Sequence, residues 1–155
     1  RGKNKPDSVV VQGVGNLMSQ LANCCQPVPG DHILGYITQG RGVSVHKDSC
    51  EQLQNLLNQH PERQIEVSWS EDLNVGYEAN LDIECNDRTG LLRDITTVLA
   101  NEGVALLGVN SLSDKNSHTA LISVSVEVSD VEALSRLTNR LRQLKDIIDV
   151  RRKTN

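Results

Sequence analysis

Apolar and polar residues alternate most regularly in the second half of the chain. Every second residue is apolar from Ala79 to Cys85, and the same alternation returns from Ala120 to Val128. This period of two predicts β-strands with one buried face and one wet face. Elsewhere in this half, apolar residues recur every three or four positions and predict two helices, with buried stripes of Leu91, Leu92, Ile95, Val98 and Leu99 and of Leu134, Leu137, Leu141 and Leu144.

Two further strands complete the second half, one from Val104 to Ser111 and one around Ile148 and Val150. The resulting order, β-α-β-β-α-β, is typical of the ferredoxin-like fold with a four-stranded antiparallel sheet. Gly103 is expected just after the first helix, because the residue that ends a helix often adopts the left-handed conformation.

Shorter elements are expected in the first half. A β-branched run at 9–11 predicts a strand, and Leu17, Met18 and Leu21 predict a short helix that runs into Cys24. A hairpin of two strands, a helix and a last strand follow, with 32–38 and 43–46 in the hairpin, Leu53, Leu56 and Leu57 in the helix and 65–69 in the last strand. The predicted fold class is α+β, with a small β-α-β-β-α-β domain ahead of the ferredoxin-like one.

Polar stretches set the expected boundaries. Residues 1–8 are a polar lead-in, 9–69 form the first domain, the acidic stretch 70–76 is a linker, and 77–155 form the second domain. The chain begins with Arg1 and not with Met, so we expect a fragment of a longer protein.

Composition narrows the class of protein. The net charge is −4, and each half contributes −2, with 6 basic against 8 acidic residues in 1–74 and 10 against 12 in 75–155. Neither half has the broad basic surface of a protein that mainly holds duplex nucleic acid, so any contact with RNA depends on local patches. No apolar run is long enough to span a membrane and no signal peptide is visible, which predicts a cytoplasmic protein with free thiols.

The most unusual segment runs from Cys24 to Cys50. It holds three of the four cysteines and two of the four histidines within 27 residues. Cys24, Cys25, His46 and Cys50 are candidate ligands of a zinc ion, which takes four such groups in a tetrahedron. A metal would also help a domain of about 60 residues, since cores this small rarely supply more than ~3–5 kcal/mol.

Two other interpretations of these residues stay open. Adjacent cysteines fit the usual C-x₂₋₄-C spacing poorly, and the three thiols are equally compatible with buried core residues beside a hydrogen-bonded histidine. A cysteine–histidine nucleophile would need an oriented base and an oxyanion hole. Nothing in the local sequence builds either, so no catalytic residue is expected.

Two loops are candidate binding sites. Gly40 and Gly42 flank Arg41 at the hairpin tip, where a guanidinium beside open backbone N–H groups suits an RNA phosphate, although a turn that simply needs glycine explains them too. The loop 86–92 leads from a strand to a helix N-terminus, which favours a carboxylate or phosphate, or merely needs Gly90 for tight packing. The basic residues near the C-terminus are expected on a solvated face.

Both halves resemble one family. CCQPVPGD, ITQGRGVSVH and Cys50 resemble the conserved-cysteine (zinc-finger-like) domain of long RelA/SpoT-type guanosine penta/tetraphosphate synthetases, and NDRTGLLRDIT with LANEGV resembles their terminal ACT domain. The resemblance covers 9–153 and leans toward the RelA type. It implies a regulatory region of a GTP pyrophosphokinase, which makes pppGpp from ATP and GTP in the stringent response.

The resemblance also implies partners and site residues. The region would help to dock the enzyme on ribosomes stalled with deacylated tRNA, and would restrain the synthetase domain of its own chain. It places a metal site, with zinc as the expected ion, on Cys24, Cys25, His46 and Cys50. If the region docks on ribosomes, the hairpin residues Gly40, Arg41, Gly42 and Lys47 are the candidate contacts with ribosomal RNA. The resemblance places an ACT ligand site or interface on Asn86, Asp87, Arg88, Thr89, Gly90, Leu91 and Leu92.

Two positions depart from the family pattern. Ser49 replaces a residue that is often acidic in relatives, so it is not expected to bind the metal. Thr89 replaces the proline of many ACT domains that bind amino acids, which leaves an amino-acid-sensing module as the alternative function. ACT domains also expose sheet edges and often pair side by side, so we expect self-association through the second half.

Overall fold

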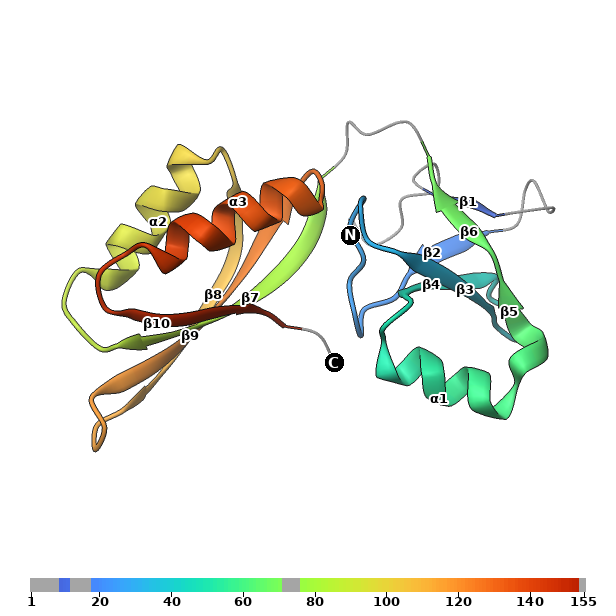
Figure 1. Ribbon diagram of the computed structural model, residues 1–155, viewed down its shortest axis with the longest axis horizontal. Helices are drawn as coiled ribbons and strands as arrows, with labels where there is room; N and C mark the ends of the chain where they lie inside the picture. Colours follow the sequence, from blue (N-terminus) through green and yellow to red (C-terminus); the bar gives the residue numbers. More distant parts are fainter. Residues whose placement is uncertain (1–8, 12–17, 71–75, 154–155) are drawn as a thin grey trace. The chain divides into compact units, whose positions relative to one another are not determined.

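A computed structural model describes residues 9–11, 18–70 and 76–153 (Figure 1). Within it the chain divides into two compact units, 1–77 and 78–153, which are described separately below. No helix in the described ranges is long and apolar enough to cross a membrane.

The first unit is built on a four-stranded mixed sheet in the order β2-β4-β3-β5. β3 (Ile33–Ile37) and β4 (Val43–Lys47) form the antiparallel hairpin that the sequence predicts. β5 (Gln64–Ile65) pairs with the outer edge of β3, and β2 (Ser19–Leu21) pairs in parallel with β4. A separate two-stranded sheet joins β1 (Val9–Val11) to β6 (Val67–Trp69).

One helix covers one face of this sheet. α1 (Glu51–Gln59) is followed by the short 3-10 helix η1 (Pro61–Arg63), and it buries Leu53 and Leu57. These leucines pack with Tyr36, Cys25 and Cys50 in one apolar cluster. Val43 and Val45 point to the opposite face, where their partners include Leu21, Ile33, Ile37, Ile65, Val67 and Trp69. The cysteines therefore belong to the layer between the sheet and α1.

The short helix expected before Cys24 is wrong. Its residues Ser19 to Leu21 form strand β2, and Asn16 and Leu17 lie outside the described residues. The apolar spacing of Met18 and Leu21 is also compatible with a strand. Parallel pairing with β4 decides between the two, and this long-range contact overrides the local helical pattern.

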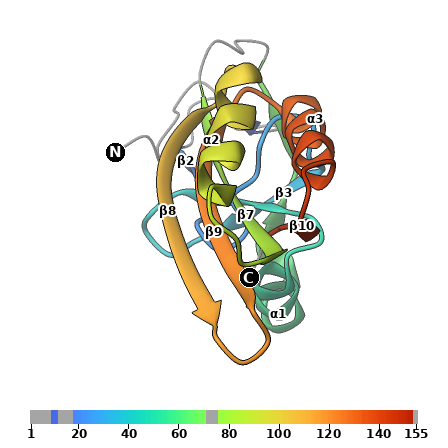
Figure 2. The same cartoon turned by 90° about the vertical axis from the view of Figure 1, so that its left-hand side faces the viewer.

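The second unit confirms the predicted α+β class in detail. β7 (Tyr77–Asn86), α2 (Leu91–Asn101), β8 (Ala105–Asp114), β9 (Thr119–Val128), α3 (Val131–Arg142) and β10 (Ile147–Arg152) follow one another in the β-α-β-β-α-β order. The sheet order is β10-β7-β9-β8, and both helices lie on one face of it, with β8 at an edge (Figures 1 and 2).

The predicted alternation fills the core under these helices. Ala79, Leu81, Ile83 and Cys85 of β7 are all fully buried, against Ile95, Leu99, Leu137 and Leu141 from the two helices. Gly103 has a φ of +69° just after α2, as predicted for a helix C-terminus. Leu92 corrects the predicted stripe, because it is 43% exposed on the outer side of α2.

Cys85 should make the stability of the second unit depend on alkaline pH. Burial and the neighbouring Asp87 raise the pKa of its thiol above 9.0, although the nearby Arg88 lowers it slightly. The folded unit therefore keeps a proton that the unfolded chain loses, and the free energy of unfolding should be constant below about pH 8 and fall as the pH rises through 9 and beyond. Urea unfolding of wild type and Cys85→Ala between pH 7 and 10.5 tests this. The prediction would be contradicted if the free energy of unfolding fell equally steeply with pH in the two proteins.

Candidate metal centre and hairpin tip

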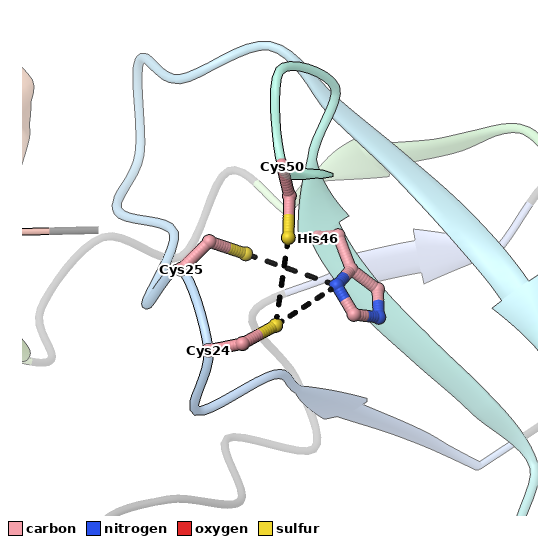
Figure 3. A group of neighbouring side chains, drawn as sticks. All are labelled: Cys24, Cys25, His46 and Cys50. Carbon is pink, nitrogen blue, oxygen red and sulfur yellow. Dashed lines mark hydrogen bonds between the residues drawn. The ribbon is translucent and has the colours of Figure 1, made fainter. Parts of the chain in front are cut away.

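Four candidate metal ligands meet at one end of the sheet in the first unit (Figure 3). Cys24 and Cys25 follow β2 after two intervening residues, His46 lies on β4, and Cys50 is the N-cap residue of α1. The parallel pairing of β2 with β4 brings the first two ligands beside the third, although 22 positions separate Cys24 from His46. The predicted set of residues thus comes together in space.

The spacing of the ligand atoms fits a tetrahedral ion. The Sγ of Cys24 lies 3.4 Å from Nδ1 of His46 and 3.5 Å from Sγ of Cys50, and the Sγ of Cys25 lies 3.8 Å from the same Nδ1. All four atoms lie within 4.8 Å of one another. Zinc bonds of about 2.3 Å to sulfur and 2.0–2.1 Å to nitrogen imply tetrahedron edges of about 3.6–3.8 Å.

Burial controls the protonation of this cluster. Desolvation raises the pKa of the Cys24 and Cys25 thiols and lowers the pKa of His46. Burial therefore favours protonated thiols at Cys24 and Cys25 and a neutral imidazole at His46 when no cation is bound. A divalent cation reverses the balance for the thiols, since it binds them as thiolates and displaces their protons.

Ser44 orients the histidine, and the sequence pattern alone did not single it out. Its hydroxyl oxygen lies 3.1 Å from Nε2 of His46. If Nε2 donates its proton to Ser44, Nδ1 presents a lone pair to Cys24 and Cys25, as a metal-binding histidine requires. The signal was available in the sequence, because residues two apart on a strand share a face. The four residues and this outer partner fit a zinc ion.

The hairpin tip is shaped by two left-handed glycines and held by the side chain of Thr38. Gly40 and Gly42 have φ values of +87° and +79°, in the left-handed region that glycine adopts freely. The Thr38 hydroxyl donates to the carbonyl of Gly42 at 2.7 Å and accepts the N–H of Arg41 at 3.2 Å. Arg41 is exposed and has no acidic partner among the ion pairs of the described ranges. An uncompensated guanidinium on a fixed turn suits a phosphate.

Lys47 does not join this tip. It is the last residue of β4, whereas Arg41 precedes the first, and five extended residues span roughly 13 Å. Its backbone N–H donates to Sγ of Cys25 at 3.3 Å, which places it beside the cysteine cluster. The structure therefore separates the predicted RNA contacts into a tip of Gly40, Arg41 and Gly42 and a distant Lys47.

The candidate ACT loop is closed by an internal ion network. Arg88 pairs through Nη2 with Asp94 and through Nε with Asp146, both at 2.8 Å, and donates to the carbonyl of Lys145 at 3.2 Å. The N–H of Asp87 donates to the carbonyl of His118 at 2.9 Å. Two carboxylates already lie close to the start of α2, which disfavours a further anion there.

Most other residues of this loop cap α2, lie in the core or contact neighbouring residues of the same unit. Gly90 caps α2 with a φ of +85°, Leu91 is buried, and Leu92 is exposed. The side chain of Asn86 lies 3.5 Å from Asp146, and Thr89 gives its carbonyl to Arg88 at 3.4 Å. The loop joins the start of α2 to the turn between α3 and β10, and no single periodic pattern could have revealed that link.

Arg88→Met should destabilise the second unit, because it leaves Asp94 and Asp146 facing each other without the cation between them. We expect a lower midpoint in urea, with a smaller difference in 1 M NaCl, which screens the repulsion. Arg93→Met is the matched control, since Arg93 neighbours the same Asp94 at 3.9 Å but is 82% exposed. An equal effect of both substitutions would contradict the network.

The C-terminal basic residues are largely paired within the second unit. Arg140 lies 3.3 Å from Glu102, and Arg151 lies 3.7 Å from Asp149. Arg142 donates to the carbonyl of Val150 at 2.6 Å. These contacts partly neutralise the positive charge of the three arginines.

Comparison with known proteins assigns each unit to a domain family. Residues 9–70 match the RelA/SpoT RIS domain, and residues 73–152 match the ACT domain family. The GTP pyrophosphokinase of Escherichia coli K12 is 51% identical over 144 residues, which cover 93% of this chain and 19% of that protein. The bifunctional (p)ppGpp synthase/hydrolase RelA of Mycobacterium tuberculosis is 37% identical over 147 residues, or 95% of this chain and 20% of that protein.

Among solved structures, the ACT domain from the GTP pyrophosphokinase of Chlorobium tepidum is 18% identical, with a TM-score of 0.45, and covers 50% of this chain and 99% of that one. The chain spans about a fifth of the length of the curated relatives it matches. The sequence matches extend through the cysteine cluster and the hairpin as well as the ferredoxin-like unit. The chain therefore belongs to the RelA/SpoT family, of which it carries a RIS domain followed by an ACT domain.

Proposed function

We propose that this region docks a RelA-type GTP pyrophosphokinase on ribosomes stalled with deacylated tRNA, and restrains its synthetase when no such ribosome is bound. The parent protein would transfer pyrophosphate from ATP to GTP in the cytoplasm. The observation that carries the proposal is the RIS domain, which combines a buried cluster of candidate metal ligands with a hairpin that has at its tip an exposed arginine without an acidic partner among the described residues. Such a feature recognises an RNA backbone by shape and charge.

In this proposal the metal is structural. Cys24, Cys25, His46 and Cys50 would hold zinc and fix the end of β2, strand β4 and the start of α1 against one another. Four protein ligands complete a tetrahedron and leave no open position for a substrate, which distinguishes a structural zinc site from a catalytic one.

Arg41 would supply the phosphate contact. Co-sedimentation of the chain with ribosomes, with and without deacylated tRNA in the acceptor site, tests this role at several salt concentrations. Arg41→Ala should weaken binding and reduce its salt dependence, because one phosphate contact is lost. Arg93 is also an exposed arginine but lies in the second unit, so Arg93→Ala should change neither the affinity nor its salt dependence. Absence of sedimentation of the wild type under all conditions would overturn the docking proposal.

Restraint of the synthetase needs the parent enzyme for its test. Deleting this region should raise pppGpp synthesis without ribosomes and abolish its stimulation by stalled ribosomes. An unchanged basal rate would contradict the restraint, whatever the outcome for docking.

We also propose that the second unit self-associates through the edge of its sheet. β8 pairs with β9 on one side only, and its exposed apolar residues are unusually many, namely Leu106, Leu107, Val109 and Leu112 (Figure 2). An apolar edge strand can gain both hydrogen bonds and burial from a second copy. Light scattering should show a dimer that Leu112→Lys weakens. A monomer at all concentrations would refute this.

A further inference from the structure

A polar pocket continues the face of the first sheet that carries the cysteine cluster. Ser44 and His46 are two residues apart on β4, so their side chains point to the same face, about 7 Å apart. Gln20 on β2 is the parallel neighbour of Ser44. Beside these residues lies a pocket of about 170 Å³, whose polar lining residues are Gln20, Asn23, Thr38, Arg41 and Ser44.

The pocket offers donors and acceptors but no acid. Its polar groups are two amides, two hydroxyls and one guanidinium, and no carboxylate lines it. Thr38 is already engaged with the hairpin backbone, and Ser44 with His46. The amides of Gln20 and Asn23 make no hydrogen bond to other residues in the described ranges, and Arg41 stands at the hairpin tip. The groups available to a ligand are therefore two amides beside one cation.

The pocket is large enough for one aromatic ring system. A cavity of about 150 Å³ holds a benzene ring, and this pocket measures about 170 Å³. Side-chain amides match the mixed donors and acceptors on the edge of a nucleobase, and a guanidinium matches phosphate. Bases in RNA become available in this way only where a loop, bulge or end leaves them unstacked.

We propose that this pocket binds a single unstacked nucleotide of RNA, with its base between the amides of Gln20 and Asn23 and an adjacent phosphate on Arg41. The inference rests on the RNA docking proposed above and names the part of the RNA that is recognised. It separates the two contributions: Arg41 gives affinity for any RNA backbone, and the amides require a base.

The cysteine cluster holds two walls of the pocket in place. Asn23 directly precedes Cys24, and the Ser44 hydroxyl contacts Nε2 of His46, on the opposite side of the ring from the thiols. A shift of either ligand therefore moves a wall. A metal ion bound by the cluster would therefore keep the pocket in shape for RNA without contacting the RNA itself.

Fluorescence anisotropy of the full chain with two labelled probes tests the pocket. One probe is a 12-nucleotide oligouridine, and the other is the same ribose-phosphate chain without bases. We expect the base-free probe to bind about tenfold more weakly, in line with the contribution of one bound base. The double variant Gln20→Ala/Asn23→Ala should lower the affinity for oligouridine to that of the base-free probe and leave the latter unchanged.

Arg41→Ala is the contrasting variant, since it should weaken both probes by the same factor. Oligouridine binding that the double variant does not change, while Arg41→Ala weakens it, would overturn the pocket and leave the docking proposal intact. Absence of binding of both probes to the wild type would overturn both.

Because Gln20 and Asn23 are exposed, the double variant should stay folded, and its urea midpoint checks this. A second measurement does not depend on substitution. Uridine monophosphate added to ¹⁵N-labelled wild type should shift the amide signals of Gln20, Asn23 and Ser44. Shifts confined to Arg41 and its neighbours at the hairpin tip would reduce the site to a phosphate contact.

Discussion

Cys50→Ser is expected to remove about one zinc ion per chain and to leave the first unit marginally stable. A structural zinc ion binds small domains with an apparent free energy of about 10–16 kcal/mol at neutral pH, and part of this binding energy is folding energy. A core of this size supplies only about 3–5 kcal/mol by itself. We therefore expect the free energy of unfolding of this unit to fall by at least about 3 kcal/mol.

Elemental mass spectrometry measures the zinc content, and the fluorescence of Trp69 during urea unfolding measures the stability. Trp69 is the only tryptophan, and it packs on the sheet of the first unit, so its fluorescence in urea reports on that unit. Cys85→Ser is the matched control, because Cys85 is equally buried but lies outside the cluster. It should keep the full zinc content. Wild-type protein purified without chelators that holds far less than one zinc ion would contradict the site.

Gly42→Ala is expected to destabilise the first unit by about 2–5 kcal/mol. A left-handed backbone costs a residue with a Cβ atom about 1–2 kcal/mol. The added Cβ would also lie 2.2 Å from the carbonyl oxygen of Met18, which accepts the N–H of Val43 at 2.8 Å. Relief of this clash breaks a bond at the start of the β2–β4 pairing, at a cost of about 1–3 kcal/mol.

Gly40→Ala isolates the backbone contribution. Gly40 has a similar φ of +87°, but nothing lies within 4 Å of its added Cβ. Its urea midpoint, followed through Trp69, should shift much less than that of Gly42→Ala, and its zinc affinity should not change. Gly42→Ala should also weaken zinc, since displacement of β2 moves Cys24 and Cys25. Equal losses in the two variants would show that the contact with Met18 contributes nothing.

The second unit could be predicted from its sequence because β7, β9, α2 and α3 have long amphipathic patterns. In β7 every inward residue is apolar and every outward residue is polar, so local pattern and final environment agree. The same reasoning placed Leu92 in the core, although only one of two adjacent leucines can face inward at the first turn of α2.

The first unit was harder to predict because its strands are short and depend on contacts with distant segments. β2 has three residues, too few to show a period, and its strand conformation depends on pairing with β4. The four ligands could be chosen by residue type, but their meeting depends on that pairing too. Arg88 acts through Lys145 and Asp146, which are far away in sequence, and a local pattern carries no information about such contacts.

The parallel pairing of β2 with β4 also sets an order of events in folding. A hairpin such as β3–β4 closes a short loop and forms early, whereas β2 must return across more than 20 residues, so its docking carries a larger loop-closure entropy. Cys24 and Cys25 thus join His46 and Cys50 only at that late step. Zinc present during synthesis would trap the docked strand, and a chain made in zinc-starved cells would expose the β4 edge to proteases and to neighbouring chains.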